Sequence, residues 1–399
     1  MPPPTLELAD IFRQHGPAYR QAHSLPLHQH RLMRAIETCR TPVLGGSVEW
    51  CDHCHFTHIQ YRSCRNRHCP KCQGLARARW LEQRTAELLP VEYFHVVFTI
   101  PEALHPIAFH NPEVVYDLLF RMTAETLLTI ARDPRHHLGA EIGFFAVLHT
   151  WGQNLHLHPH LHCVVPGGGL SPDDQWIACR PGFFLPVAVL SALFRRLFLD
   201  ALEKAHADGR LRFFGEWESL RDSHAFLCYL APLRETDWVV YAKPPFGGPQ
   251  QVLEYLGRYT HRVAISNQRL LALEDGQVSF RWKDYRHAQR PKVMTLSADE
   301  FIRRFLLHAV PRGFQRIRYY GFLANCHRLD KLDFCRRCLA VPNSDLLPRP
   351  LAYGEFREFY ARLTGRNLKR CPQCGIGTMI QIEILSSCHG PIPLHVDTS

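Results

Sequence analysis

The sequence lacks several features that would assign the protein to a familiar class. No stretch approaches 18 uninterrupted apolar residues, so we expect no membrane-spanning helix. The N-terminal stretch MPPPTLELADIF has neither the charged start nor the apolar run of a secretion signal, so a cytoplasmic location is expected. The sequence contains no glycine-rich dinucleotide- or phosphate-binding loop, no repeat of fixed period and no low-complexity tract.

Basic charge is in excess. The chain carries a net charge of +10. Its length of 399 residues is enough for more than one domain, and its hydrophobic content of 46% is enough for folded cores. A basic surface suits a polyanionic partner, although many basic proteins bind no nucleic acid.

The chain also has 15 cysteines, several of them in C-x-x-C pairs. Without an export signal, this pattern favours metal binding over disulfides. Fourteen residues separate Cys51-x-x-Cys54 from Cys69-x-x-Cys72, which is close to the spacing of a zinc ribbon. Cys64 and His68 lie between the two pairs and could replace one of the four ligands. The alternative is a set of reduced thiols without metal. The sequence predicts a structural zinc ion held by Cys51, Cys54, Cys69 and Cys72.

A further pair near the C-terminus, Cys371 and Cys374, predicts a possible second zinc site. Its partner pair is ambiguous: Cys335-x-x-Cys338 or Cys388-His389 could complete the ligand set. Exposed reduced cysteines are the alternative.

Hydrophobic patterning predicts a mixture of antiparallel-type strands and helices, with a poorly structured tail after about residue 383. Strands are expected at 93–100, 143–151, 160–166, 238–243 and 278–285. Helices are expected within 1–45 and at 75–89, 112–131, 186–207 and 297–310, the last with a capped start.

Four histidines of one parity lie at 156, 158, 160 and 162. Because a strand alternates its faces, His160 and His162 point the same way and Leu161 points into a core. Residues i and i+4 of a strand lie about 13 Å apart, so all four cannot bind one ion. Pro159 places the start of the regular strand near His160. We expect His160 and His162 to bind a divalent metal, with His158, Gln153 or a residue of a neighbouring strand as third ligand; a structural zinc site or a polar strand face is the alternative.

Tyr255 and Tyr259 would lie side by side on a helix that also carries basic residues. Packing is the usual role of such a pair, but a basic, aromatic helix after a Pro-Gly loop favours a surface that faces DNA. The phenol has a pKa of about 10, so a nucleophilic tyrosine would need a metal-polarised phosphate and nearby cations. The predicted DNA contacts are Lys243, Arg258 and Arg262, together with Arg65, Arg67 and Lys71 in the cysteine-rich segment.

Long ordered segments resemble the double-tyrosine HUH transposases of the IS91 family. They are NRHCPKCQ (66–73), HTWGQNLHLHPHLHCVVPGGGLS (149–171), WVVYAKPPFGGPQQVLEYLGRYTHRVAISNQRL (238–270) and YYGFLANCHR (319–328). The resemblance implies an α+β fold with a central antiparallel sheet of HUH-endonuclease type, flanking helices, a small N-terminal zinc-ribbon-like module and a possible C-terminal zinc module. The expected domains are 1–90 (helical and zinc-binding), 91–310 (catalytic) and 311–399 (C-terminal).

The resemblance also implies rolling-circle transposition on single-stranded DNA. His160 and His162 match the metal pair, for Mg²⁺ or Mn²⁺, and Tyr255 and Tyr259 match the nucleophiles that join the DNA 5′-phosphate. Cytoplasmic, nucleoid-associated action on the ends of the element and on target DNA is expected. The alternatives are a plasmid or phage replication initiator and a non-catalytic, zinc-dependent DNA-binding regulator with inert tyrosines.

Overall fold

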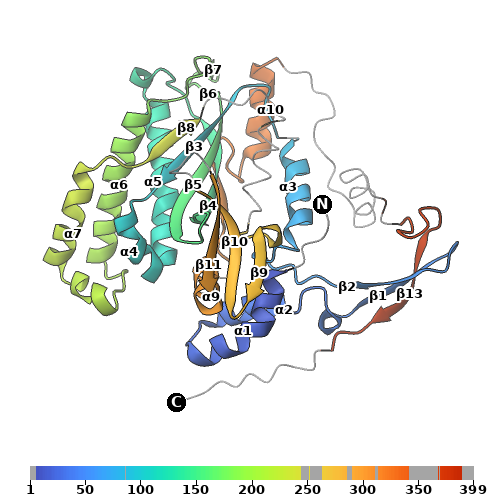
Figure 1. Cartoon of the computed structure of the whole chain (residues 1–399). Helices are drawn as coiled ribbons and strands as arrows, with labels where there is room; N and C mark the ends of the chain where they lie inside the picture. Colours follow the sequence, from blue (N-terminus) through green and yellow to red (C-terminus); the bar gives the residue numbers. More distant parts are fainter. Residues whose placement is uncertain are drawn as a thin grey trace. The chain divides into compact units, whose positions relative to one another are not determined.

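A computed structural model describes residues 6–85, 87–243, 251, 263–284, 290–310, 313–340, 367 and 369–388 (Figure 1). The chain divides into two compact units, each discontinuous in sequence. The first unit comprises Met1–Trp80, His261–Ala309 and Pro348–Ser399, and the second comprises Leu81–Thr260 and Val310–Leu347. This division differs from the three consecutive domains expected from the sequence.

The second unit is built on a five-stranded antiparallel sheet of order β12-β4-β5-β3-β8. Its strands are β3 (Tyr93–Thr99), β4 (Gly143–Trp151), β5 (Leu157–Pro166), β8 (Val240–Lys243) and β12 (Ile317–Gly321). Its helices are α4 (His105–His110), α5 (Pro112–Arg132), α6 (Val187–Ala207), α7 (Ser223–Glu235) and α10 (Arg328–Cys338), and β6 (Gly168–Leu170) pairs with β7 (Trp176–Ala178). Helix α3 (Gln73–Thr85) crosses the boundary between the units.

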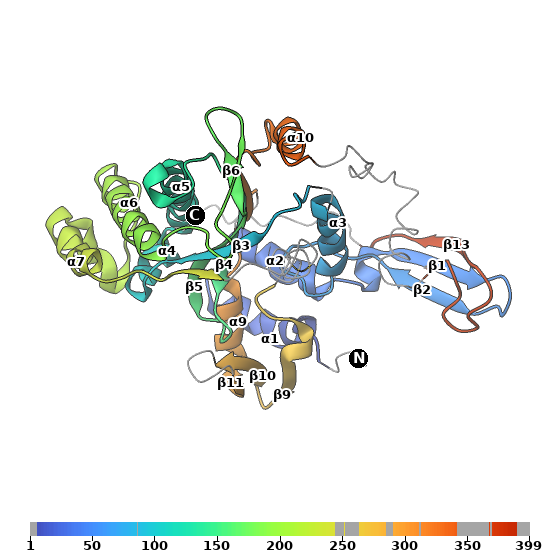
Figure 2. The same cartoon turned by 90° about the horizontal axis from the view of Figure 1, so that it is seen from above.

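The two faces of this sheet differ in chemistry. On one face Phe98, Leu148 and Leu161 are fully buried in the main core, which α4, α5 and α6 cover. Figure 2 shows these helices and α7 gathered on one side of the strands. The alternate residues of β4 and β5 carry histidines on the opposite face. The hydrophobic alternation therefore determines which side chains lie on the sheet face opposite the core.

Among its described residues, the first unit combines the helices α1, α2 and α9 with two three-stranded sheets, of order β11-β10-β9 and β13-β1-β2. Its elements are α1 (Leu8–Ala22), α2 (Leu27–Glu37), β1 (Gly46–Cys51), β2 (Thr57–Tyr61), β9 (Leu270–Glu274), β10 (Gln277–Asp284), β11 (Arg290–Ser297), α9 (Ala298–Leu306) and β13 (Met379–Leu385). The 261–309 segment joins this unit because it packs on α1: the Phe12 and Phe305 rings meet edge to face at 5.5 Å, and Leu8 N donates to Asn267 Oδ1 at 3.2 Å.

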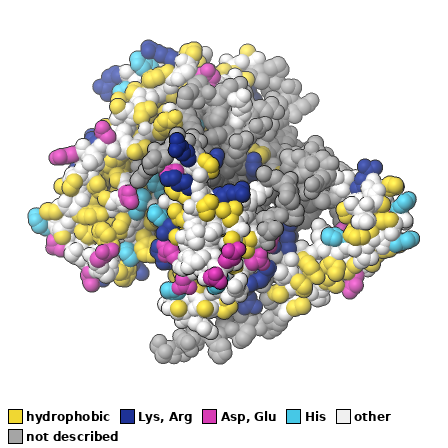
Figure 3. Space-filling model, in the orientation of Figure 1, with side chains coloured by type: hydrophobic (Ala, Val, Ile, Leu, Met, Phe, Trp, Pro, Cys, Tyr) yellow, Lys and Arg dark blue, Asp and Glu magenta, His cyan; other side chains and the backbone are white. Residues whose placement is uncertain are grey.

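The β13-β1-β2 sheet has little core of its own. Ile59, Ile380, Ile382 and Ile384 are all at least 44% exposed, and Figure 3 shows hydrophobic and histidine side chains on the surface of this lobe. Its buried cluster consists of Cys51, Cys371 and Met379, with partly buried Cys54, Phe56 and Cys374 packed against it. Because a small sheet without a hydrophobic core is marginally stable, the cysteines are well placed to hold it together.

The mixed α+β prediction is confirmed, as is the cap of α9, where the Ser297 hydroxyl accepts from Glu300 N at 3.3 Å. Strand β5 begins at Leu157, earlier than predicted, because its ladder with β4 continues past Pro159 through a register shift between His149 and Trp151. Several elements were not predicted from the sequence: the helices α4, α7 and α10 and the strands β1, β2, β6, β7, β9, β11, β12 and β13. Among the described residues, the structure shows no helix with the length and apolar content needed to cross a membrane.

Candidate metal centres

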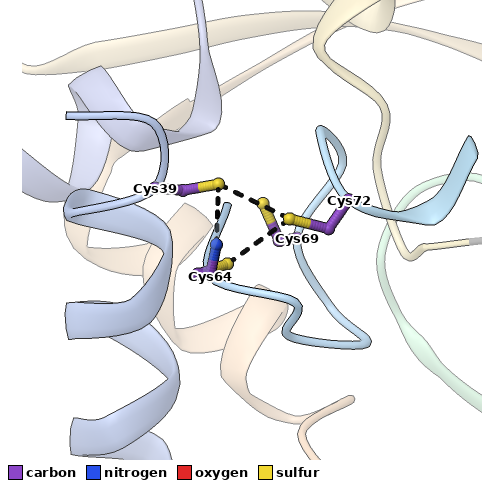
Figure 4. Close-up of side chains that lie close together, drawn as sticks. All are labelled: Cys39, Cys64, Cys69 and Cys72. Atoms are coloured by element: carbon purple, nitrogen blue, oxygen red, sulfur yellow. Dashed lines mark hydrogen bonds between the residues drawn. The ribbon is translucent and has the colours of Figure 1, made fainter. Parts of the chain in front are cut away.

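The first cysteine centre consists of Cys39, Cys64, Cys69 and Cys72, whose sulfurs all lie within 4.8 Å of one another. Figure 4 shows the four side chains pointing together, with Cys72 Sγ 3.5 Å from Cys39 Sγ and 3.6 Å from Cys64 Sγ. Four thiolates at about 2.3 Å from a tetrahedral zinc ion would lie about 3.8 Å apart, so the arrangement fits zinc with a slight expansion.

The thiolate form is favoured at two of the four cysteines of this centre, Cys39 and Cys72. Hydrogen bonds from the thiols of Cys39, Cys64 and Cys69 hold the pKa of Cys72 far below its usual range. Hydrogen bonding from Cys64 lowers the pKa of Cys39 to about 7. Asn66 N also donates to Cys64 Sγ at 3.5 Å, as backbone amides do around metal-bound thiolates.

The second cysteine centre joins Cys51 and Cys54 to Cys371 and Cys374, residues from opposite ends of the chain. Cys51 Sγ lies 3.8 Å from Cys374 Sγ, and Cys54 Sγ lies 3.6 Å from Cys371 Sγ. The predicted grouping of Cys51, Cys54, Cys69 and Cys72 is therefore corrected, because β1 pairs with β13 and so brings the C-terminal pair to Cys51.

Both C-x-x-C turns of the second centre have the same backbone design. Each is followed by a residue of positive φ, His55 at 59° and Gly375 at 66°. Each also directs amides at sulfur: Cys54 N donates to Cys51 Sγ at 3.5 Å, and Gly377 N donates to Cys374 Sγ at 3.4 Å. The Gly377 bond lowers the pKa of Cys374 to about 6, which favours a thiolate ligand.

The other cysteines suggested for the second centre lie elsewhere. Cys338 Sγ is 3.5 Å from the Asp174 carbonyl oxygen, and Cys388 Sγ is 3.9 Å from the Pro42 carbonyl oxygen. Cys335 is buried beside Leu332 and Phe322 in a separate hydrophobic cluster. The pairing of β1 with β13 brings Cys371 and Cys374 to Cys51 and Cys54, and these four thiols complete the second centre without Cys335, Cys338 or Cys388.

The predicted phosphate-binding residues near the first centre differ in availability. Arg65 is exposed, whereas burial lowers the pKa of Arg67. Lys71 Nζ forms an ion pair with Glu7 Oε2 at 2.6 Å. Arg65 is therefore the most accessible of the three for a phosphate.

A histidine centre lies on the face of the five-stranded sheet opposite the helices. The ligand nitrogens of His149, His160 and His162 all lie within 4.8 Å of one another. His149 comes from β4 and faces His160 across the ladder, while His162 stands two residues further along β5. The third member of the cluster is thus on a neighbouring strand, one of the three possibilities that the sequence left open.

His158, the tentative third ligand, does not belong to this group. Its main-chain carbonyl oxygen instead lies 2.7 Å from His160 Nδ1. A carbonyl can only accept, so Nδ1 of His160 carries the proton and Nε2 keeps its lone pair for a metal. Burial lowers the pKa of His158, and its ring packs edge to face on His105.

Four of the predicted catalytic and DNA-binding residues, Tyr255, Tyr259, Arg258 and Arg262, lie outside the described residues, as does Pro244–Gln250 before them. Lys243 is the last residue of β8 and stands opposite His95 of β3 in the ladder. The chain therefore enters the tyrosine-bearing segment from a strand of the histidine-bearing sheet.

Comparison with known proteins places the chain in a defined class, the transposases that carry a zinc-binding domain. A family described as "Transposase zinc-binding domain" matches residues 11–100, and one described as "Putative transposase" matches residues 143–330. The chain is 63% identical over 399 residues to "Putative transposase y4qJ" of Sinorhizobium fredii (strain NBRC 101917 / NGR234), with 98% of each chain covered.

A more distant relative is "Transposase for insertion sequence element IS801" of Pseudomonas savastanoi pv. phaseolicola. It is 29% identical over 301 residues, covering 72% of this chain and 68% of that protein. No solved structure matches the chain. The chain belongs to the IS91 family of transposases.

Proposed function

We propose that this transposase cleaves and rejoins single-stranded DNA through a tyrosine–5′-phosphate intermediate and so drives rolling-circle transposition of its insertion sequence in the cytoplasm, at the nucleoid. The observation that carries the proposal is the cluster of His149, His160 and His162 on the sheet face turned away from the helical core. Membership of the family supports a role in transposition, and the cluster supports the proposal of a metal site of the HUH kind.

The donor set fits a divalent metal. The three side chains offer imidazole nitrogens, and the hydrogen bond from His160 Nδ1 to the His158 carbonyl oxygen leaves the other ring nitrogen of His160 to bind a metal. Three protein ligands leave further positions for phosphate oxygens, and a bound metal would act there as a Lewis acid. Imidazole ligands favour Mn²⁺ over Mg²⁺, so we expect both ions to support activity and Mn²⁺ to bind more tightly.

We assign the nucleophiles to Tyr255 and Tyr259, and DNA contacts to Lys243, Arg258, Arg262 and Arg65. The tyrosine oxygen would attack a phosphorus, form a bond to the 5′-phosphate and release a 3′-OH; the second tyrosine would repeat the step on another strand. The nearby cations would stabilise the charge that develops on the phosphate. We assign a structural Zn²⁺ to each cysteine centre, since four thiolates leave no open position.

A covalent adduct tests this function. Purified protein with Mn²⁺ is incubated with single strands that cover the sequences flanking its gene, labelled on either side of the cleavage site. We expect a denaturation-resistant adduct that carries only the 3′-side fragment. Tyr255→Phe/Tyr259→Phe should abolish it, and each single variant should retain part of it.

The matched control is Tyr241→Phe, which removes an exposed phenol of β8 that has no assigned role. It should form the adduct at the wild-type level. Full adduct yield from the double variant would overturn the assignment of the nucleophiles.

A further inference from the structure

A fourth histidine contacts the histidine centre without belonging to its ligand group. His95 Nε2 lies 2.8 Å from His162 Nδ1, and the two rings stack in parallel with centroids 5.0 Å apart and an interplanar angle of 9°. His95 is 1% exposed and His162 is 8% exposed. This is a short hydrogen bond between two buried imidazoles, and one of the two nitrogens must donate.

The position of His95 follows from the register of the sheet. Val97 of β3 stands directly opposite His162 of β5, so His95 lies on the same face, one diagonal step away. Its ladder neighbours are Val164 on β5 and Lys243 on β8. The backbone thus holds the His95 ring against the ring of His162.

The ligand role of His162 determines the direction of this bond. A neutral imidazole that binds a metal through Nε2 carries its proton on Nδ1. Nδ1 of His162 would then donate to Nε2 of His95, which must be unprotonated and act as acceptor. Metal-binding histidines commonly donate their second N–H to such a partner, which orients the ring and makes it a better ligand.

We propose that His95 is a positioning residue of the metal centre: it accepts the Nδ1 proton of His162 and fixes the tautomer and ring orientation that metal binding requires. The inference rests on the proposed function of the histidine centre. It gives His95 a role distinct from those of the ligands, because His95 itself would not touch the metal.

The tautomer of the neighbouring ligand, His160, is fixed by a different group. His160 uses the His158 carbonyl to fix its own tautomer. Each of the two β5 ligands therefore has its own acceptor, a main-chain carbonyl for His160 and a side chain for His162. Only the acceptor of His162 can be removed by substitution.

Two variants separate positioning from packing. His95→Phe keeps an aromatic ring to stack on His162 but removes the acceptor. His95→Gln can place its Oε1 near the position of Nε2 and so restore an acceptor. His206→Phe is the matched control: His206 Nε2 donates to the Leu220 carbonyl oxygen at 2.8 Å, and its ring stacks on Phe226 with centroids 4.2 Å apart, but it lies on α6.

The measurement is the Mn²⁺ dissociation constant of the full-length, zinc-loaded protein, followed by the loss of the free-Mn²⁺ resonance in electron paramagnetic resonance. We expect His95→Phe to weaken binding about 10- to 100-fold. We expect His95→Gln to recover most of that loss, and His206→Phe to bind like the wild type.

The outcomes distinguish this inference from the function on which it rests. Wild-type protein that binds no Mn²⁺, or binds it equally well after His160→Ala, would overturn the proposed metal site and the role of His95 together. Wild-type affinity in His95→Phe, alongside His160-dependent binding, would overturn the role of His95 alone. Equal weakening by Phe and Gln would show that His95 acts by packing, which also contradicts the proposal.

Discussion

The cysteine centres and the histidine centre differ in the number of their ligands and in the backbone elements that carry those ligands. Each cysteine centre brings together four thiols, and the histidine centre brings together three imidazoles. The thiols lie on turns, loops or the end of a strand, where amides donate to sulfur, as in the bonds from Cys54 N and Gly377 N. The histidines stand on adjacent strands of a sheet whose other face is a hydrophobic core.

In the proposed function, this difference corresponds to two roles: the cysteine centres stabilise the fold, and the histidine centre takes part in cleavage. Four thiolates saturate a tetrahedral ion, and in the second centre they also tie β1 to β13. Three imidazoles fixed on strands leave positions for a substrate, and strands hold ligands more rigidly than loops do. The comparison predicts that the two kinds of centre respond independently to substitution.

The largest expected effect is on cleavage. His160→Ala and His162→Ala should each reduce formation of the covalent DNA adduct by at least about 100-fold, beyond the loss typical of an outer-shell change. His156→Ala is the control, because His156 shares the strand parity but lies outside the cluster. Comparable losses in all three variants would remove the distinction between ligands and neighbours.

Removal of the C-terminal thiols should change the metal content. Cys371→Ser/Cys374→Ser should lower bound zinc from two ions to one per chain, because Cys51 and Cys54 alone cannot hold the ion tightly. Limited proteolysis should then cut near β13, which loses its tether to β1. Cys338→Ser/Cys388→Ser should retain both ions, and loss of zinc from that control would contradict the grouping.

The third ligand can be tested by a pair of single substitutions. His149→Ala should weaken Mn²⁺ binding by at least about 10-fold, whereas His158→Ala should leave the His160–carbonyl hydrogen bond in place and change the affinity much less. Calorimetric titration with Mn²⁺ measures both. A stronger effect from His158→Ala would restore the side chain of residue 158 as the ligand.

The smallest effect concerns a histidine outside the centres. Burial lowers the pKa of His105 to about 4, so the unfolded chain binds more protons than the folded chain between that pH and about 6.5. Its contribution to stability is present above about pH 6.5 and is lost as the pH falls toward 4. His105→Leu should flatten the decline of the melting temperature in this window; an unchanged slope would contradict the assignment.

The features of the site that depend on local sequence could be predicted from the sequence. Strand parity pointed to His160 and His162, and the alternation that buried Leu161 in the core also placed them on the sheet face opposite that core. His149 was part of a recognised segment, but its approach to His160 depends on antiparallel register, which spacing within one strand does not reveal. His95 gave no signal of its own, because a lone histidine in a buried strand has no motif.

The cysteine groupings show the same limit. Spacing favoured Cys51, Cys54, Cys69 and Cys72 because both pairs lay close in sequence. The fold instead joins Cys51 to Cys374, 323 residues away, through the pairing of β1 with β13. Cys39 lies outside any C-x-x-C motif, so only the three-dimensional return of the chain beside Cys64 could identify it.

The most direct test of the division between structural and catalytic metal sites is the zinc content of the purified wild-type protein and of His160→Ala/His162→Ala, measured by mass spectrometry on folded samples. We predict two zinc ions per chain in both, with adduct formation lost only in the variant. Three ions in the wild type and two in the variant would show that the histidines hold a structural zinc, and would contradict the account.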